Sequence, residues 1–468
     1  MAEKLFENIA ELREAVAGPA LLPDDEGFAS ECGAFNLSYV LEPAVAVGVT
    51  SVADVQAALR FAAKNQLPVA VKATGHQAAR DARGAVLINL ARLAAVQIDA
   101  ARRIARVEGG VTWGTVVAEA AKHGLAPMSG SAETVSVIGY TLGGGQSPVF
   151  GRSQGYAADH VTRIEVVTAD GELRQVTAES EPDLFWALRG GKGNFGVVTA
   201  IEFELFEVPE FYGGGLHFAG ERMADVLRVW STWTAALPEQ ASTSVAVQRL
   251  PPLPEVPEPL QGAFVLHVRF AYLGSAEEGE RLLAPIRAAA PVLIDGVQLL
   301  PYTENTLVHL DPPTPVPWYD ATTTLREFSP AVLDALLDFA GPDSGNPLFS
   351  VEIRALGGAL DREPPVPNAV PTRGVPYVVF GAGLGGPQEA DVVSEWLDRM
   401  TKTFAPWTVD GRRVVNFLSR TDGVTPEQMR LIYGGERYDR LAQIKRRFDP
   451  QNMFRINHNI APAEATSH

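Results

Sequence analysis

The chain has one cysteine, fewer basic than acidic residues and no long hydrophobic run, and each of these features excludes a class of protein. Cys32 is the only cysteine among 468 residues, so neither an intramolecular disulfide nor a cysteine-based zinc cluster can form, and we expect no metal site. Lysine and arginine number 39 against 56 aspartates and glutamates, which gives a net charge of −17. This charge repels phosphate groups, so we expect neither nucleic acid nor a membrane surface as a partner.

Long hydrophobic runs are also missing. The apolar segment at 241–247 is far shorter than the roughly 18 residues of a membrane span, and it contains serine and threonine. The first residues carry acidic side chains at helical spacing, where a signal peptide would have a basic start and an apolar run. Hydrophobic residues make up 46% and charged residues 20%, as in an ordinary globular protein. We therefore expect a cytoplasmic protein, as a monomer or homodimer.

Strands and helices alternate in the first part of the chain. Residues 44–49 and 67–71 read as strands around a helix at 52–65, which predicts a βαβ unit. After residue 208, proline-rich loops separate helices from strands, which predicts a second domain of α+β type from 208 to 410. Its predicted helices are 223–237, 276–290, 330–339 and 389–404, and its predicted strands are 263–270, 349–355 and 377–380.

Glycine-rich segments indicate a ligand site. Residues 191–196 match the dinucleotide fingerprint GxGxxG, but a predicted helix precedes them and a predicted strand follows, which excludes a Rossmann NAD site. Residues 143–145 are three consecutive glycines, which are costly in backbone entropy unless the chain lies against a ligand, although a plain tight turn is the alternative. The loop 72–77 leaves a predicted strand and can form an anion-binding nest. Two such loops predict one extended ligand.

Several motifs occur in the order and spacing of a known family. They are Thr74-Gly75-His76, the segment 130–135 with the glycine triplet, the segments 155–161, 183–191 and 195–199, and the C-terminal segments 438–441, 448–452 and 457–460. These segments resemble the berberine-bridge-enzyme-like FAD-linked oxidases, of the PCMH-type FAD-binding superfamily. The similarity covers most of the chain and is weakest between 208 and 345.

The resemblance implies a two-domain α+β fold with FAD as cofactor. Residues 1–207 and 411–468 would hold FAD, and residues 208–410 would form a substrate-binding domain built on an antiparallel sheet. His76 lies where the family attaches the flavin through an imidazole nitrogen, so we expect a covalent bond there. The expected cofactor-binding residues are Lys72, Ala73, Thr74, Gly75, His76, Gln77, Gly130, Ser131, Thr134, Gly139, Thr141, Gly143, Gly144, Gly145, Tyr156, Gly196, Val198, Asn457 and Asn459.

Two departures from the family bear on the chemistry. Many relatives have a second tether, a cysteine, where this chain has Ala132, so we expect a monocovalent flavin. Phe417 stands where alcohol-oxidising members carry a catalytic tyrosine, and phenylalanine cannot take a proton. The remaining candidate base is Glu352, whose pKa burial would raise; the alternative is a structural ion pair with Arg354. Tyr140 is the second candidate, as a hydrogen-bond donor to a substrate oxygen.

We expect an oxidase that uses O2 and acts on a bulky aromatic or polyketide-like secondary metabolite. The second domain offers aromatic residues and no evident cluster of charges: Trp230, Trp233, Tyr302, Trp318 and Tyr319. The alternatives are a polyketide-tailoring monooxygenase that oxygenates flavin N5, a dehydrogenase with another electron acceptor, and a carrier that keeps FAD without turnover. Lys192 replaces a residue that is usually glycine in the family, and nothing in the sequence accounts for it.

Overall fold

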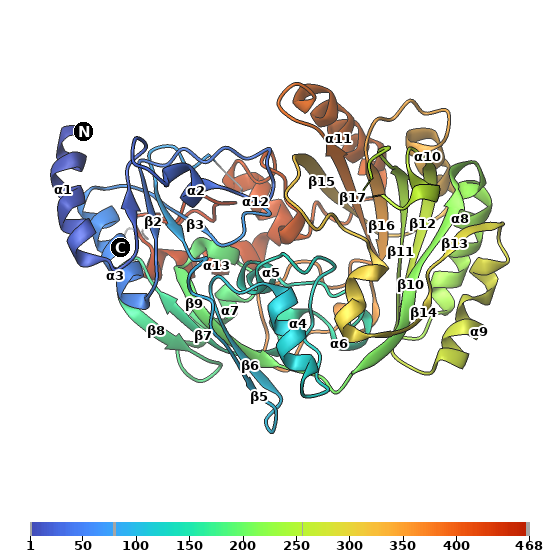
Figure 1. Ribbon diagram of the computed structural model, residues 1–468, viewed down its shortest axis with the longest axis horizontal. Coiled ribbons are helices and arrows are strands. Elements are labelled where there is room, and N and C mark those ends of the chain that lie inside the picture. Colours follow the sequence, from blue (N-terminus) through green and yellow to red (C-terminus); the bar gives the residue numbers. More distant parts are fainter. Residues whose placement is uncertain (1, 78–80, 255, 465–468) are drawn as a thin grey trace.

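The computed structural model describes residues 2–77, 81–254 and 256–464 (Figure 1). Its strands form sheets of four, five and eight strands. In Figure 1 the eight-stranded sheet and its helices lie on one side of the molecule and the two smaller sheets on the other. The predicted α+β fold is confirmed, while the predicted domain boundaries stay a prediction. Within the described residues, no helix has both the length and the apolar character that crossing a bilayer requires.

The four-stranded sheet contains the predicted βαβ unit. Helix α3 (Val52–Lys64) connects β2 to β3, and it begins where the Ser51 hydroxyl accepts a hydrogen bond from Asp54 N at 3.2 Å. Strands β2 and β3 both run parallel to β4, which lies between them. The elements of this part are α1 (Ala2–Ala15), β1 (Ala20–Leu21), α2 (Phe28–Cys32), β2 (Val45–Gly48), β3 (Val69–Lys72) and β4 (Val86–Asn89).

The five-stranded antiparallel sheet has the order β5-β6-β9-β7-β8. Its core includes Leu184 and Leu441, which lie on helices far apart in sequence, so the C-terminal segment packs against the first part of the chain. The elements are β5 (Val96–Asp99), β6 (Ile104–Glu108), α4 (Trp113–Ala121), α5 (Val137–Leu142), α6 (Gly151–Gln154), β7 (Val161–Val167), β8 (Leu173–Val176), α7 (Pro182–Leu188), β9 (Val197–Glu204), α12 (Pro426–Tyr433) and α13 (Gly435–Phe448).

The eight-stranded antiparallel sheet has the order β13-β10-β12-β11-β16-β17-β15, with β14 paired to β10. Helices α8 (Met223–Trp233), α9 (Ala276–Arg287), α10 (Pro330–Ala340) and α11 (Ala390–Phe404) cover one face and bury an apolar core (Figure 1). The strands are β10 (Glu210–Ala219), β11 (Ala241–Arg249), β12 (Phe264–Tyr272), β13 (Val292–Asp295), β14 (Gln298–Pro301), β15 (Trp318–Leu325), β16 (Ser350–Ala355) and β17 (Tyr377–Leu384).

The sequence predicts β12, β16, β17 and the four helices, but not the other strands of this sheet. Strand β11 shows the reason, because both of its faces are buried. Ser242, Ser244 and Gln248 are at most 9% exposed, although they point away from the helix-covered core. Polar residues on a buried face remove the alternation of exposed polar and buried apolar residues by which such strands are found. The sheet therefore presents a buried polar face to the rest of the molecule.

Candidate active site

A cavity of about 480 Å³ lies between this polar face and the loops that follow β3 and precede α5. Its size is typical of cofactor and substrate sites. Both predicted catalytic residues, Tyr140 and Glu352, lie in its wall. The predicted cofactor-binding residues that also line it are Lys72, Ala73, Thr74, Gly75, His76, Gln77, Gly130, Ser131, Gly139, Gly196, Val198 and Asn457.

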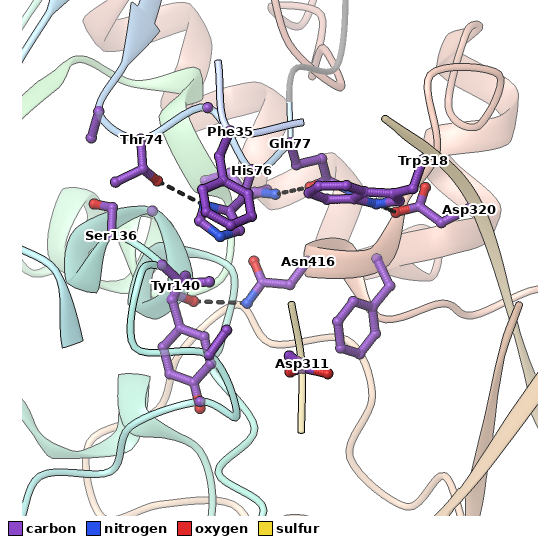
Figure 2. Close-up of a pocket in the computed structure, with 18 of the residues that line it drawn as sticks. Phe35, Thr74, His76, Gln77, Ser136, Tyr140, Asp311, Trp318, Asp320 and Asn416 are labelled. Atoms are coloured by element: carbon purple, nitrogen blue, oxygen red, sulfur yellow. Dashed lines mark hydrogen bonds between the residues drawn. The ribbon is translucent and has the colours of Figure 1, made fainter. Parts of the chain in front are cut away.

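His76 is held in one orientation at the cavity wall (Figure 2). Its Nδ1 lies 3.0 Å from the Thr74 hydroxyl oxygen, and its Nε2 lies 3.1 Å from that of Thr134. The Phe35 ring stacks on the imidazole at a centroid distance of 4.0 Å. Burial lowers the pKa of His76 to about 4, against a smaller opposite effect of Asp311, so the imidazole is neutral at neutral pH.

The cavity wall carries buried polar atoms that have no partner within the described protein. Apart from atoms of His309, Glu352 and Arg354, they are Ser136 Oγ, Tyr140 OH, Gln146 Oε1 and Asn457 Oδ1. Buried polar atoms are normally hydrogen-bonded, so these four mark positions where a bound molecule supplies the partner. The cavity size, the small-residue loop 72–77 and these atoms fit a large polar cofactor such as FAD.

The glycine triplet lies against protein side chains, which differs from the predicted ligand contact. A Cβ on Gly143 would fall 1.8 Å from Asn416 Oδ1, and one on Gly145 would fall 2.4 Å from a ring carbon of Tyr140. A Cβ on Gly144 would approach Val370 at 3.2 Å. Close packing around the cavity therefore requires glycine at 143 and 145, and none of the three residues lines the cavity.

Four further residues that the sequence assigns to the cofactor also lie outside the cavity lining: Thr134, Thr141, Tyr156 and Asn459. Thr134 still contacts His76. Tyr156 is buried, and its hydroxyl pairs with Thr372 Oγ1 at 2.8 Å. Thr141 Oγ1 and Asn459 Oδ1 are buried without a partner in the described protein.

Lys192, for which the sequence offers no account, bridges two segments of the cavity wall. Its Nζ donates hydrogen bonds to Gln77 Oε1 at 2.8 Å and to Val415 O at 3.2 Å. Burial lowers its pKa to about 8, and the negative charge of Asp320 opposes this effect. The lysine thus ties the loop that carries His76 to the C-terminal segment.

Glu352 is an ion-paired carboxylate. Its Oε1 lies 2.7 Å from Arg269 Nη1, and its Oε2 lies 2.9 Å from Arg354 Nη2. Burial alone would raise the pKa of Glu352, as the sequence predicts, but Arg354 and Arg269 outweigh it and hold that pKa well below its usual range. The predicted raised pKa is therefore wrong. The alternative prediction, an ion pair with Arg354, is present and includes a second arginine.

The polar sheet face carries the cluster of charges that the sequence does not reveal. Arg269 comes from β12, Glu352 and Arg354 from β16, and His309 follows a loop after β14. All four side chains are at most 12% exposed. Their positions in sequence are widely separated, so only the sheet pairing brings them together. The expectation that the second domain has no cluster of charges is therefore wrong.

Aromatic side chains still form part of the cavity wall, but mostly not the predicted ones. Of the five named from the sequence, Trp318 lines the cavity, whereas Trp230 and Trp233 lie in the core beneath the helices. Tyr302 is buried elsewhere and donates a hydrogen bond to Pro127 O at 2.7 Å. The other aromatic side chains of the wall are Phe35, Tyr140, Phe349, Phe380 and Phe417.

Asp320 is a cavity residue that the sequence analysis missed. The indole of Trp318 donates a hydrogen bond to its Oδ2 at 3.2 Å (Figure 2). Burial raises the pKa of Asp320 to about 7, with Asp422 adding to the effect and Arg420 and Lys192 opposing it. The signal that could have found it is its place two residues after Trp318, because alternate residues of a strand share a face.

Cys32 lies outside the cavity lining, in α2. Burial raises the pKa of its thiol to about 11, so it carries no thiolate at neutral pH. Ala132, where the resemblance implies a missing second tether, does line the cavity.

In comparison with known proteins, two family models match segments of the chain that contribute residues to this cavity. An FAD binding domain family matches residues 43–177, and a family described as berberine and berberine like matches residues 416–461. The chain is an FAD-linked oxidoreductase with a berberine-like C-terminal segment. (R)-6-hydroxynicotine oxidase of Paenarthrobacter nicotinovorans is 27% identical over 96% of this chain and 97% of that protein.

Solved structures of similar proteins share the fold. The crystal structure of 6-hydroxy-D-nicotine oxidase from Arthrobacter nicotinovorans has a TM-score of 0.81 and 26% identity, covering 96% of this chain and 98% of that one. BBE-like 1 of Physcomitrella patens has a TM-score of 0.85 at 19% identity, covering 99% and 100%, and this likeness concerns the fold alone. The two matched segments meet at the cavity described above. Gly75 and Ser131 of the first segment and Asn457 of the second all line it.

Proposed function

We propose that this chain is an oxidase that carries FAD on His76 through one covalent bond and passes electrons from a small organic substrate to O2. The observation that supports this most strongly is the protonation state and position of His76. Its imidazole is neutral, and it lies at the wall of the cavity between two threonine hydroxyls. A neutral imidazole is nucleophilic, as attachment to the flavin 8α carbon requires.

The described residues would hold FAD in the following way. The loop 72–77 would face the flavin with its backbone, and Ser136 and Asn457 would supply polar contacts, because their buried oxygens lack other partners. FAD, when bound, takes two electrons from the substrate and delivers them to O2. Ala132 offers no sulfur, so a single tether at His76 is proposed.

The substrate would lie between FAD and the polar sheet face. Phe380, Phe417 and Trp318 offer aromatic surface to a ring, and the relative named above is by its name an oxidase of a hydroxylated nicotine. We therefore propose an aromatic substrate with a polar substituent, such as a secondary metabolite. Tyr140 would contact it as a donor. Glu352 would hold the arginines of the sheet face in place, because an ionised, doubly paired carboxylate is a poor proton acceptor at neutral pH.

Flavin retention tests the proposal. The purified yellow protein is denatured in acid, and we expect the flavin to stay with the polypeptide. His76→Ala should release its flavin under the same treatment, whereas His123→Ala, which changes an exposed histidine outside the cavity, should retain it. Release of flavin from the unmodified protein would contradict the covalent bond.

The rate of reoxidation by O2 tests the second part of the proposal, that O2 is the electron acceptor. Protein reduced by substrate without air should be reoxidised rapidly by dissolved O2, with one hydrogen peroxide formed for each substrate oxidised. An oxygen atom found in the product would identify a monooxygenase instead, and slow reoxidation would identify a dehydrogenase with another acceptor.

A further inference from the structure

Arg354 has a free donor edge at the cavity. Its Nη2 is used by Glu352 at 2.9 Å, and its guanidinium lies over the Phe417 ring, with Cζ 4.9 Å from the ring centroid. Its Nε is buried and has no acceptor among the described residues. Arg269 differs, because its Nε contacts His267, its Nη1 pairs with Glu352 and its Nη2 contacts His309 O. Arg354 is thus the arginine of this cluster with a donor left for a ligand.

Tyr140 presents a second free donor, and glycines fix its orientation. A Cβ on Gly130 would lie 3.0 Å from one edge of the ring, and one on Gly145 would lie 2.4 Å from the other edge. Trp113 packs edge-on against the ring at 5.3 Å. The hydroxyl is buried without a partner in the described protein. Burial raises the pKa of Tyr140 well above its usual value, against the effect of nearby Arg354, so it stays a protonated donor.

The cluster around Arg354 carries an excess of positive charge. Arg269 and Arg354 share the one carboxylate of Glu352. Burial, together with Arg269, lowers the pKa of both His267 and His309, so both imidazoles are neutral at neutral pH. The two arginines are therefore only half neutralised by the groups that contact them on the sheet face.

Space for a ligand atom continues past Arg354. A small void of about 20 Å³ is lined by Arg354, Gln146, Ser242 and Ser244, and the first two of these also line the main cavity. Ser244 lies directly opposite Arg354 in the pairing of β11 with β16, and the hydroxyls of both serines are buried without a partner in the described protein. This end of the cavity thus offers hydrogen-bond donors beside an uncompensated positive charge.

We propose that Arg354 and Tyr140 form a subsite for an anionic oxygen of the substrate, either a carboxylate or the oxygen of an ionised phenol. The inference rests on the proposed function, because the substrate would occupy the same cavity. Charged acceptors form the stronger hydrogen bonds with arginine, and a buried excess charge is stabilised by an opposite one. A phenol bound in this way gives its proton to bulk water, so no further reactant is needed. Phe417 cannot act as a base. The positive charge of Arg354 would instead stabilise the ionised oxygen of the substrate.

Calorimetric titration of the flavin-loaded protein with matched probes tests the subsite. Benzoate is compared with neutral benzamide, and phenol with methoxybenzene. We expect at least one anion to bind roughly 10-fold to 100-fold more tightly than its neutral counterpart, as for a charge-assisted hydrogen bond. A preference for benzoate that is constant above pH 6 identifies a carboxylate site. A preference for phenol that grows with pH identifies a phenolate site.

Variants of Arg354 and Tyr140 test whether these residues cause the preference for the anionic probes. Arg354→Gln should abolish it, Arg354→Lys should keep part of it, and Tyr140→Phe should weaken it several-fold. Glu352 keeps its contact with Arg269 in the Arg354 variants, so we expect them to fold. Equal binding of the charged and neutral probes by the unmodified protein overturns the inference, and so does a preference that survives Arg354→Gln. Both results are separate from loss of the flavin, which would refute the proposed function itself.

Discussion

Asp320→Asn should make the protein more stable at alkaline pH. The Asp320 carboxyl faces the cavity and accepts a hydrogen bond from the Trp318 indole, and asparagine can accept the same hydrogen bond. Lys192 and Arg420 favour the ionised carboxyl and Asp422 disfavours it, but burial has the largest effect. The natural side chain therefore pays a desolvation penalty when it ionises, and the amide does not.

The size of this effect follows from the pKa. Burial moves the pKa of Asp320 from 3.8 to about 7. At ~1.36 kcal/mol for each pKa unit, ionising Asp320 in the folded protein is unfavourable by up to roughly 4 kcal/mol. Between these two pH values the folded state holds a proton that the unfolded state has lost, so stability falls as pH rises and levels off above 7.

Urea unfolding at pH 5 and pH 8, followed by tryptophan fluorescence, measures the effect. The stability of Asp320→Asn relative to the unmodified protein should increase by roughly 3 kcal/mol between the two pH values. A difference that stays constant, or an unmodified protein that is the more stable one at pH 8, would refute the reasoning.

Two further variants test the packing of the site by urea unfolding. Glu352→Gln leaves two buried guanidiniums without their carboxylate, so we expect a loss of roughly 3 to 5 kcal/mol, and a loss below about 1 kcal/mol would contradict the ion-pair assignment. Gly145→Ala and Gly84→Ala share a left-handed backbone, with φ of 75° and 74°, but only the first would place its Cβ against the Tyr140 ring. Gly145→Ala should therefore lose roughly 1 to 3 kcal/mol more than Gly84→Ala, and equal losses would contradict this.

The sequence predicts local structure and the cofactor loop well. Ser51 and the apolar stripe after it predict α3, and the β-branched runs on either side predict β2 and β3. The loop with His76 and the segment from Gly130 are found by their order and spacing. These features depend on neighbouring residues, which a sequence displays directly.

The polar sheet face could not be predicted in the same way. Arg269 and Glu352 lie on strands β12 and β16, which are separated in space by β11, and nothing in the sequence states that order. From the sequence only Arg354 is visibly near Glu352, so the sequence predicts that burial decides the pKa of the carboxyl. The second arginine reverses that direction.

The glycine triplet shows the same limit. A sequence indicates that Gly143 to Gly145 need close approach, but not whether a ligand or a side chain approaches. Asn416, which meets Gly143, lies more than two hundred residues later, and its Nδ2 donates to Tyr140 O at 2.8 Å (Figure 2). Close packing and ligand contact leave the same glycine signature.

The mass of the proteolytic peptide that contains His76 tests the central claim most directly. Attachment forms one bond between the imidazole and the flavin 8α carbon with loss of two hydrogens, and O2 takes the two electrons. The peptide should therefore be heavier by the mass of FAD less two hydrogens. A His76 peptide of unmodified mass, isolated from protein that is still yellow, would contradict the account.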